Sequence, residues 1–191
     1  MRHKPEAVES ISESQNVKVW DAEWLAFYRE WRPRLLAFLL SLTDDTRFLE
    51  DVVEDSLLVS RRYWERIRNY DKPSAYLFKI GKQELRSRQA KDARWHQHPH
   101  GHVDDAPDGA RDLASLGIAE KRCDIIAAIR RLPPRCGEAV ALYYFGDYST
   151  VQIAEIQHLA EGTVRAQLTF GRQRLSEMLK ETSDVDEGGT S

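Results

Sequence analysis

The chain has 191 residues, a net charge of −3 and a hydrophobic content of 41%. This length suffices for two compact helical modules of about 70 residues each. No apolar run approaches the roughly 18 residues that a membrane-spanning helix needs, and the N-terminal segment is too polar for a secretory signal. Cys123 and Cys136 have neither disulfide-framework nor metal-ligand spacing, which predicts reduced thiols in a cytosolic protein.

Charge is segregated along the chain although its sum is small. The segment 43–58 carries six acidic residues and one arginine, whereas 72–94 carries seven basic residues and two acidic ones. Such segregation predicts separate surfaces for a basic partner and for a polyanion. The alternative is that these segments are ordinary solvated helix faces.

Helical spacing of apolar residues appears first over 31–42, where Pro33 predicts that a helix begins or is kinked. A second helix is expected over 44–67, because two aspartates at its start suit the helix dipole. The segment 69–73 is a turn by composition. Ser74 then predicts the N-cap of a third helix, which ends in a basic stretch.

From about residue 97 to 119 periodicity is lost and His, Pro, Gly and Asp dominate, which predicts a flexible linker. In the block that follows, Pro133 ends a first helix, and Ser149 with Gln152 matches a capping box. The sequence has no strand pattern and no internal repeat. The expected fold is therefore all-α, with two small helical domains joined by a flexible linker.

The segment 149–175 gives the strongest functional signal, because it matches a helix-turn-helix. Ala154 occupies the position where this motif needs a small residue for close helix crossing. The early turns of its second helix would enter a DNA major groove. An antiparallel helical hairpin with a polar face is the alternative. The residues of suitable type for DNA contact are Arg165, Gln167, Thr169 and Arg172.

Several stretches resemble the sigma factors of bacterial RNA polymerase, and in particular the small extracytoplasmic-function class. Similarity to the C-terminal domain of that class lies at 129–136 (IRRLPPRC), 141–149 (ALYYFGDYS), 153–156 (IAEI) and 162–165 (GTVR). Similarity to its N-terminal domain lies at 50–57 (EDVVEDSL) and 74–81 (SAYLFKIG). The two sets occur in the expected order and together cover roughly residues 18–182.

The resemblance implies a transcription initiation factor that binds core RNA polymerase and promoter DNA, with an anti-sigma factor as a further candidate partner. It implies no enzyme activity, no catalytic residue and no cofactor. An autonomous helix-turn-helix regulator is the alternative, although no dimer interface or effector domain is visible. The implied layout is a polar tail (1–17), an N-terminal sigma domain (18–96), an acidic His/Pro/Gly linker (97–119), a C-terminal sigma domain (120–182) and an acidic tail (183–191).

The resemblance also implies three binding surfaces. The implied polymerase-binding residues are Asp51, Glu54, Asp55 and Leu58. Those implied for the separated strand of the minus-ten element, which needs stacking partners and cations, are Asn69, Tyr70, Lys72, Tyr76, Lys79, Gln83 and Arg86. For the minus-thirty-five duplex, Thr163 and Ala166 join Arg165, Gln167, Thr169 and Arg172. The two tyrosines are alternatively plain core residues.

The chain departs from the family pattern at several positions. Gln83 stands where Asn is usual, and Tyr76 stands where Trp is usual. His158 replaces the Gly of the helix-turn-helix turn, so it must adopt a left-handed backbone. Gln167 and Phe170 lie where Arg or Lys is frequent. Promoter preference therefore does not carry over from the family, and weaker phosphate anchoring is expected.

Four histidines at 96, 98, 100 and 102 form the one feature outside the family pattern. Clustered imidazoles could bind Zn²⁺ or Ni²⁺. Without cysteines or orienting carboxylates nearby, incidental composition is the preferred explanation, and no metal site is predicted. A metal-dependent enzyme built on this cluster would lack any nucleophile–base arrangement.

Overall fold

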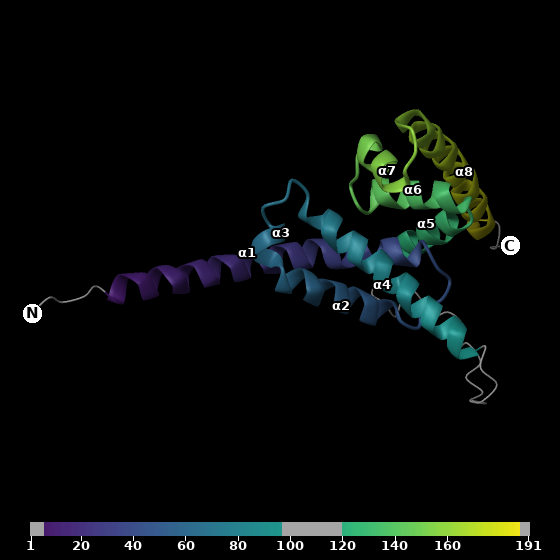
Figure 1. The fold of residues 1–191 in the computed structure, drawn as a ribbon. Helices are drawn as coiled ribbons and strands as arrows, with labels where there is room; N and C mark the ends of the chain where they lie inside the picture. The colour runs from purple at the N-terminus through teal and green to yellow at the C-terminus, as the bar shows by residue number, and fades with distance from the viewer. Residues whose placement is uncertain (1–5, 97–119, 188–191) are drawn as a thin grey trace, which may run out of the picture.

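A computed structural model describes residues 6–96 and 120–187, with side chains described over 22–95 and 122–180 (Figure 1). These residues form helices and no strand, so the all-α prediction is confirmed. The predicted linker lies outside the described residues. The helices are α1 (Glu6–Leu40), α2 (Leu49–Arg62), α3 (Trp64–Ile67), α4 (Pro73–His96), α5 (Glu120–Arg130), α6 (Pro134–Tyr144), α7 (Thr150–Gln157) and α8 (Glu161–Glu187).

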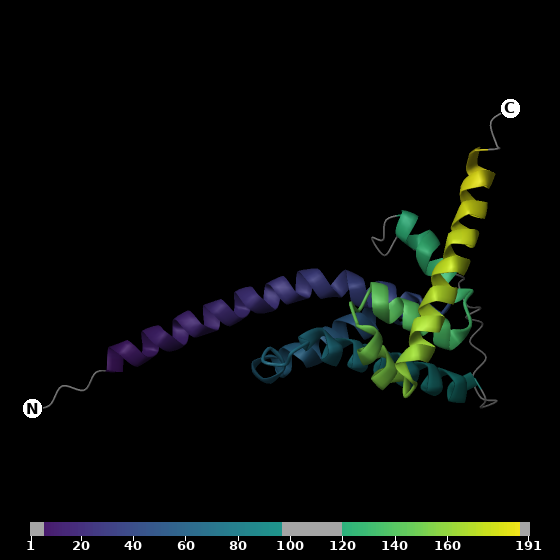
Figure 2. The same cartoon turned by 90° about the horizontal axis from the view of Figure 1, so that it is seen from above.

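Helices α1, α2 and α4 pack together as an N-terminal block. Residues 35–40 of α1 are all buried, and the Phe38 and Phe78 rings meet at a centroid distance of 5.0 Å. At the other end of the block, Trp64 packs edge-on against Trp24 at 5.3 Å. Figure 2 shows α1 extending well beyond this block as one curved helix. The block thus anchors the C-terminal half of α1 and holds α2 beside α4.

Two predicted helix starts in this block are wrong, and one of the two alternatives at Pro33 is excluded. Helix α1 begins at Glu6 and continues through Pro33, so no helix begins at that proline. Helix α2 begins at Leu49 and not at Asp44, because the residues between them form a hydrogen-bonded loop. Ser74 is buried inside α4, whose first residue is Pro73. Proline is well suited to the first helical position, since its missing N–H would have no partner there.

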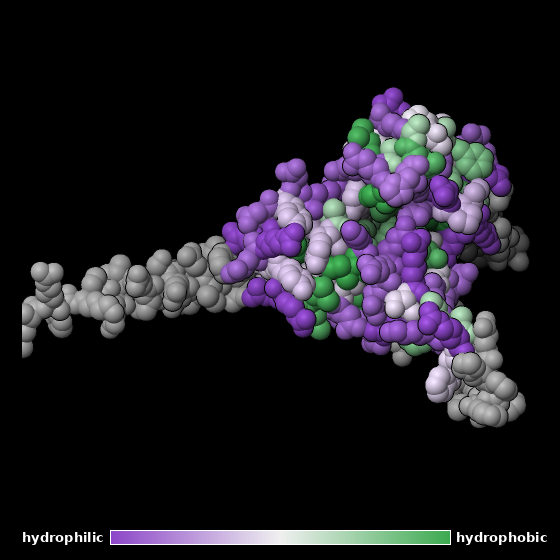
Figure 3. Space-filling view, viewed as in Figure 1, coloured by the Kyte–Doolittle hydropathy of each residue, from purple (hydrophilic) through white to green (hydrophobic). Residues whose placement is uncertain are grey.

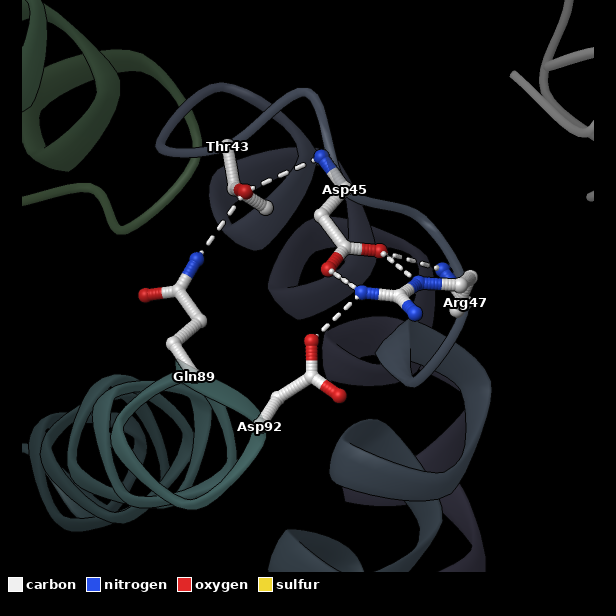
Figure 4. Close-up of polar contacts among 5 residues, drawn as sticks. All are labelled: Thr43, Asp45, Arg47, Gln89 and Asp92. Carbon is white, nitrogen blue, oxygen red and sulfur yellow. Dashed lines mark hydrogen bonds and ion pairs between the residues drawn. The ribbon is translucent and has the colours of Figure 1, made fainter. Parts of the chain in front are cut away.

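The loop before α2 is held by charged side chains (Figure 4). Asp45 accepts hydrogen bonds from both the backbone N–H and the guanidinium of Arg47. Arg47 also contacts Asp92 of α4 at 2.7 Å, and Gln89 of α4 donates to Thr43 Oγ1 at 3.0 Å. The pKa of Asp45 is lowered chiefly by the hydrogen bond from Arg47. Asp45 therefore organises the loop where a helix N-terminus was expected.

Helices α5 to α8 form a C-terminal block in which α8 contacts each of the other three. Its core includes Ile129, Val140, Ile153 and Val164, all fully buried. Cys136 is a buried free thiol that donates to the Gln167 carbonyl at 3.3 Å, and burial raises its pKa. The expected burial is thus found for Cys136, whereas Cys123 is only partly buried.

The two blocks lie against each other along α4 (Figure 1). Lys82 of α4 forms an ion pair with Glu138 of α6, and both side chains are largely shielded from solvent. The Phe78 ring meets the Tyr148 ring edge-on at 6.1 Å. Arg130 of α5 contacts Asp44 at 2.7 Å. The C-terminal block is therefore positioned by α4 together with the loop before α2.

Two glycines of α8 offer a matched test of its packing on α6. A Cβ at Gly171 would lie 2.5 Å from Val140 Cγ2, whereas one at Gly162 would meet nothing within 4 Å. We expect Gly171→Ala to lower the free energy of unfolding by about 1–3 kcal/mol through overpacking, despite the better helix propensity of alanine. Gly162→Ala should leave it unchanged or raise it. Denaturant unfolding checks both variants, and equal stabilities would contradict the close approach of α6 and α8.

Candidate nucleic-acid interface

Helix α7 has the N-terminal cap that the sequence predicts. Ser149 Oγ accepts from the Gln152 N–H at 3.2 Å, and Gln152 Oε1 accepts from the Ser149 N–H at 3.0 Å. Both hydrogen bonds of the capping box are therefore present. Ala154 is buried, and α7 packs against α8 as its predicted role requires.

The turn between α7 and α8 is closed by local hydrogen bonds. His158 has φ 54° and ψ 48°, which is the left-handed backbone expected for the residue that replaces Gly. Leu159 N–H donates to the Ala154 carbonyl at 2.9 Å. Thr150 donates to Glu161 Oε1 at 2.6 Å and thereby lowers the pKa of that carboxyl. The first residues of α7 and α8 are thus joined directly.

Helix α8 presents one face to the block and the opposite face to solvent. Val164, Leu168, Gly171 and Leu175 are buried. The residues between them turn outward, as the helical period requires. Of the residues predicted to contact DNA, those that are exposed on this helix are Thr163, Arg165, Ala166, Thr169 and Arg172.

The predicted DNA-contacting residues of α8 differ in how they are held. Gln167 is half-buried, and its Oε1 is enclosed without a hydrogen-bond partner among the described residues. Arg165 pairs with Glu161 at 2.7 Å while remaining 67% exposed. The guanidinium of Arg172 lies 4.8 Å from the centre of the Tyr143 ring. Gln167 therefore lies at the edge of the outer face, whereas Arg165 remains accessible.

Sequence reasoning missed further exposed residues on α8. Gln173 lies seven residues after Ala166, and Arg174 follows it, where it pairs with Glu177 at 2.7 Å. Phe170 is 48% exposed. Residues seven apart share a helix face, so the predicted contact residue Ala166 could have indicated Gln173 on the same face.

Three residues predicted for the minus-ten strand form one stripe on α4. Lys79, Gln83 and Arg86 are exposed and follow the spacing of a single helix face. Together with residues of α6 and α7 they line a cavity of about 660 Å³. Its lining from the C-terminal block includes Glu138 and Glu155. The stripe therefore faces the helix-turn-helix in this structure.

The other predicted minus-ten residues lie near the turn before α4. Lys72 donates to the Asp147 carbonyl and lies 4.2 Å from the centre of the Tyr148 ring, and burial lowers its pKa. Tyr76 is half-buried, with its ring 6.4 Å from that of Tyr63. Asn69 donates to the Glu65 carbonyl at 2.9 Å. Tyr70 is 40% exposed.

An acidic stripe lies on α2. Asp51, Asp55 and Leu58 are spaced along one face and are 71%, 51% and 66% exposed. Arg88 of α4 contacts both aspartates from one side. Glu54, the fourth predicted polymerase-binding residue, instead pairs with Arg32 of α1 at 2.7 Å. The structure thus keeps three of the four predicted residues on one open face.

Within the described part of the chain, no group of three or more His, Cys, Asp or Glu residues could hold a metal ion. The histidines at 98, 100 and 102 lie outside the described residues. Likewise, none of the described helices is long and apolar enough to cross a membrane.

The helix-turn-helix belongs to a matched family segment. Residues 124–175 match the family model of sigma-70 region 4. The chain is also similar to the ECF RNA polymerase sigma factor SigL of Mycobacterium tuberculosis. The two are 28% identical over 158 residues, covering 82% of this chain and 88% of that protein.

Solved structures show the same fold. The sigma factor RpoE of Bartonella quintana, solved with the anti-sigma factor NepR, is 26% identical with a TM-score of 0.58, covering 83% of this chain and 97% of that one. CnrH, solved with the cytosolic domain of CnrY, is 18% identical with a TM-score of 0.51, covering 84% of this chain and 90% of CnrH. Together these matches support an extracytoplasmic-function sigma factor of the sigma-70 family, which is a promoter-directing transcription initiation factor and not an autonomous regulator.

Proposed function

We propose that three separate surfaces of this sigma factor perform its function. The stripe of Asp51, Asp55 and Leu58 binds core RNA polymerase. The stripe of Lys79, Gln83 and Arg86 on α4, with the turn before it, binds the separated minus-ten strand. The outer face of α8 binds the minus-thirty-five duplex. The chain supplies no catalytic group, and the polymerase performs the chemistry on promoters in the cytoplasm.

The observation that carries the proposal is the occurrence of an exposed acidic stripe and an exposed helix-turn-helix face in one chain. Two carboxylates beside an exposed leucine suit a partner surface that offers cations around an apolar centre. The outer face of α8 offers arginine and hydroxyl side chains, which are the groups that contact phosphates and base edges.

Binding to polymerase must also change how the two blocks are placed. The α4 stripe lines a cavity shared with α6 and α7, and Lys82 is paired with Glu138. A DNA strand cannot lie along α4 while α7 occupies that side. We infer that this arrangement belongs to the free protein, and that the blocks separate along the residue 97–119 linker in the holoenzyme.

The remaining assignments follow from the same scheme. We infer an N-terminal sigma domain over 18–96 and a C-terminal sigma domain over 120–182. Because RpoE was solved with the anti-sigma factor NepR, we infer an anti-sigma factor as a partner of this chain as well.

Charge reversal on α2 tests the polymerase surface. Asp51→Lys/Asp55→Lys should weaken binding to core polymerase about tenfold or more, because like charges would then meet. Run-off transcription, which should require both polymerase and this protein, should fall in parallel. Both carboxylates are exposed, so the thermal unfolding midpoint should change little.

The matched control for this variant is Glu65→Lys/Asp124→Lys, which makes the same change of charge at exposed sites on α3 and α5. It should bind polymerase as the parent chain does. If both double variants bound equally well, the acidic stripe would not be the polymerase surface.

Two arginines of α8 separate base contact from phosphate contact. Arg165 lies in the first turns of α8. Its replacement by alanine should reduce the discrimination of the holoenzyme between bases at one promoter position by about 1–3 kcal/mol. Arg172 lies beside Tyr143. Its replacement by alanine should weaken binding to all promoters alike, and the slope of log binding constant against log salt concentration should fall by about one unit. A library of randomised upstream elements, transcribed by each holoenzyme, measures both effects. An unaltered selected sequence for Arg165→Ala would count against base contact by this helix.

A further inference from the structure

Phe170 lies on the outer face of α8 without a structural reason to be there. Its side chain is 48% exposed, while its neighbours Leu168 and Gly171 are buried. No ring or cation–π contact of Phe170 is found among the described residues. An exposed aromatic ring does not gain the free energy of burial. Contact with a partner outside the chain would therefore be favourable for Phe170.

The surroundings of Phe170 favour a DNA groove as that partner. By helical spacing, Arg165 and Arg172 share one edge of the outer face, and Arg174 lies on the other. Cations on both edges match the two phosphate backbones that border a major groove. Ala166 lies one turn before Phe170 and is also exposed. The face between the arginines thus carries the apolar Phe170 and Ala166 beside the polar Gln173, and its Arg174 edge also holds the ion-pair partner Glu177.

Figure 3 shows that apolar residues interrupt the hydrophilic surface of the C-terminal block. The edge of a base pair in the major groove carries a single apolar group, the 5-methyl of thymine. An aromatic ring between phosphate-binding edges contacts that methyl well and gains nothing from the hydrogen-bonding groups of the other bases.

We propose that Phe170 is a specificity-determining residue that contacts the 5-methyl group of a thymine in the upstream promoter element. This inference rests on the proposed function, because it requires α8 to lie in the major groove. It adds one chemical preference at one base pair, set by an apolar contact and not by a hydrogen bond.

Replacement of thymine by deoxyuridine tests the contact, because it removes only the methyl group. Thymines of a selected upstream element are replaced one at a time, and holoenzyme affinity is measured. At one position we expect deoxyuridine to weaken binding about three- to tenfold. The holoenzyme with Phe170→Ala should bind the thymine and deoxyuridine forms equally at that position, and Phe170→Leu should retain part of the difference.

Val151→Ala is the matched control, because Val151 is a 50% exposed apolar residue on α7. It should keep the full sensitivity to the methyl group. Thermal unfolding of each variant shows whether the fold is intact, and an exposed position should leave it so.

The outcomes separate this inference from the proposed function. Specific binding without any sensitivity to the methyl group, or equal sensitivity with and without Phe170, overturns the inference while leaving the proposed function in place. If Phe170→Ala weakens binding to polymerase while methyl sensitivity persists, Phe170 is a protein contact and the inference is wrong. A holoenzyme that forms no promoter-specific complex contradicts the proposed function itself.

Discussion

The contact between α4 and the C-terminal block is the constraint on which the rest of the account depends. The stripe of α4 that carries Lys79, Gln83 and Arg86 is the same side on which α6 and α7 lie. Lys82 projects from this side to Glu138, and Phe78 reaches Tyr148. One helix thus serves both the packing of the two blocks and the proposed binding of DNA, and it cannot do both at once.

The physical character of this contact suits an arrangement that must open. An open pocket of about 660 Å³ lies between the blocks, so α6 and α7 cover this side of α4 only in part. The Lys82–Glu138 pair is largely shielded from solvent, and a pair of this kind adds little net stability because desolvation offsets its attraction. Separation of the blocks returns both charges to water, which offsets much of the lost attraction. The cost of opening is therefore within reach of the binding energy of a large partner.

Local features of the chain could be predicted from the sequence. The capping box at Ser149, the left-handed backbone at His158 and the buried Ala154 each depend on a few adjacent residues, and each is found. The start of α2 could not be predicted in this way, because Asp45 has a competing partner in Arg47, itself paired with Asp92 of α4. Long-range contacts were likewise inaccessible. Lys82 and Glu138 are 56 residues apart, and no local pattern relates them.

The residue types of the candidate site could be predicted from the sequence, but the exposure of each side chain could not. The family resemblance implied Asp51, Glu54, Asp55 and Leu58 as one surface, but it could not show that Glu54 pairs with Arg32 of α1. Residue type suggested Gln167 for base contact, yet its position relative to Val164 and Leu168 places it at the margin of the outer face. The exposed aromatic at 170 required knowledge of which face of α8 is buried.

The distance between α4 and α7, measured by spin labels at Ala90 and Val151 with both native cysteines replaced, tests the account most directly. The account predicts a short, narrow distance distribution in the free protein and a longer one when core polymerase is added. In the free protein, Lys82→Glu should shift the distribution toward the longer distance, and a second change, Glu138→Lys, should restore the short one. A distribution that is identical in the free and polymerase-bound protein would contradict the account.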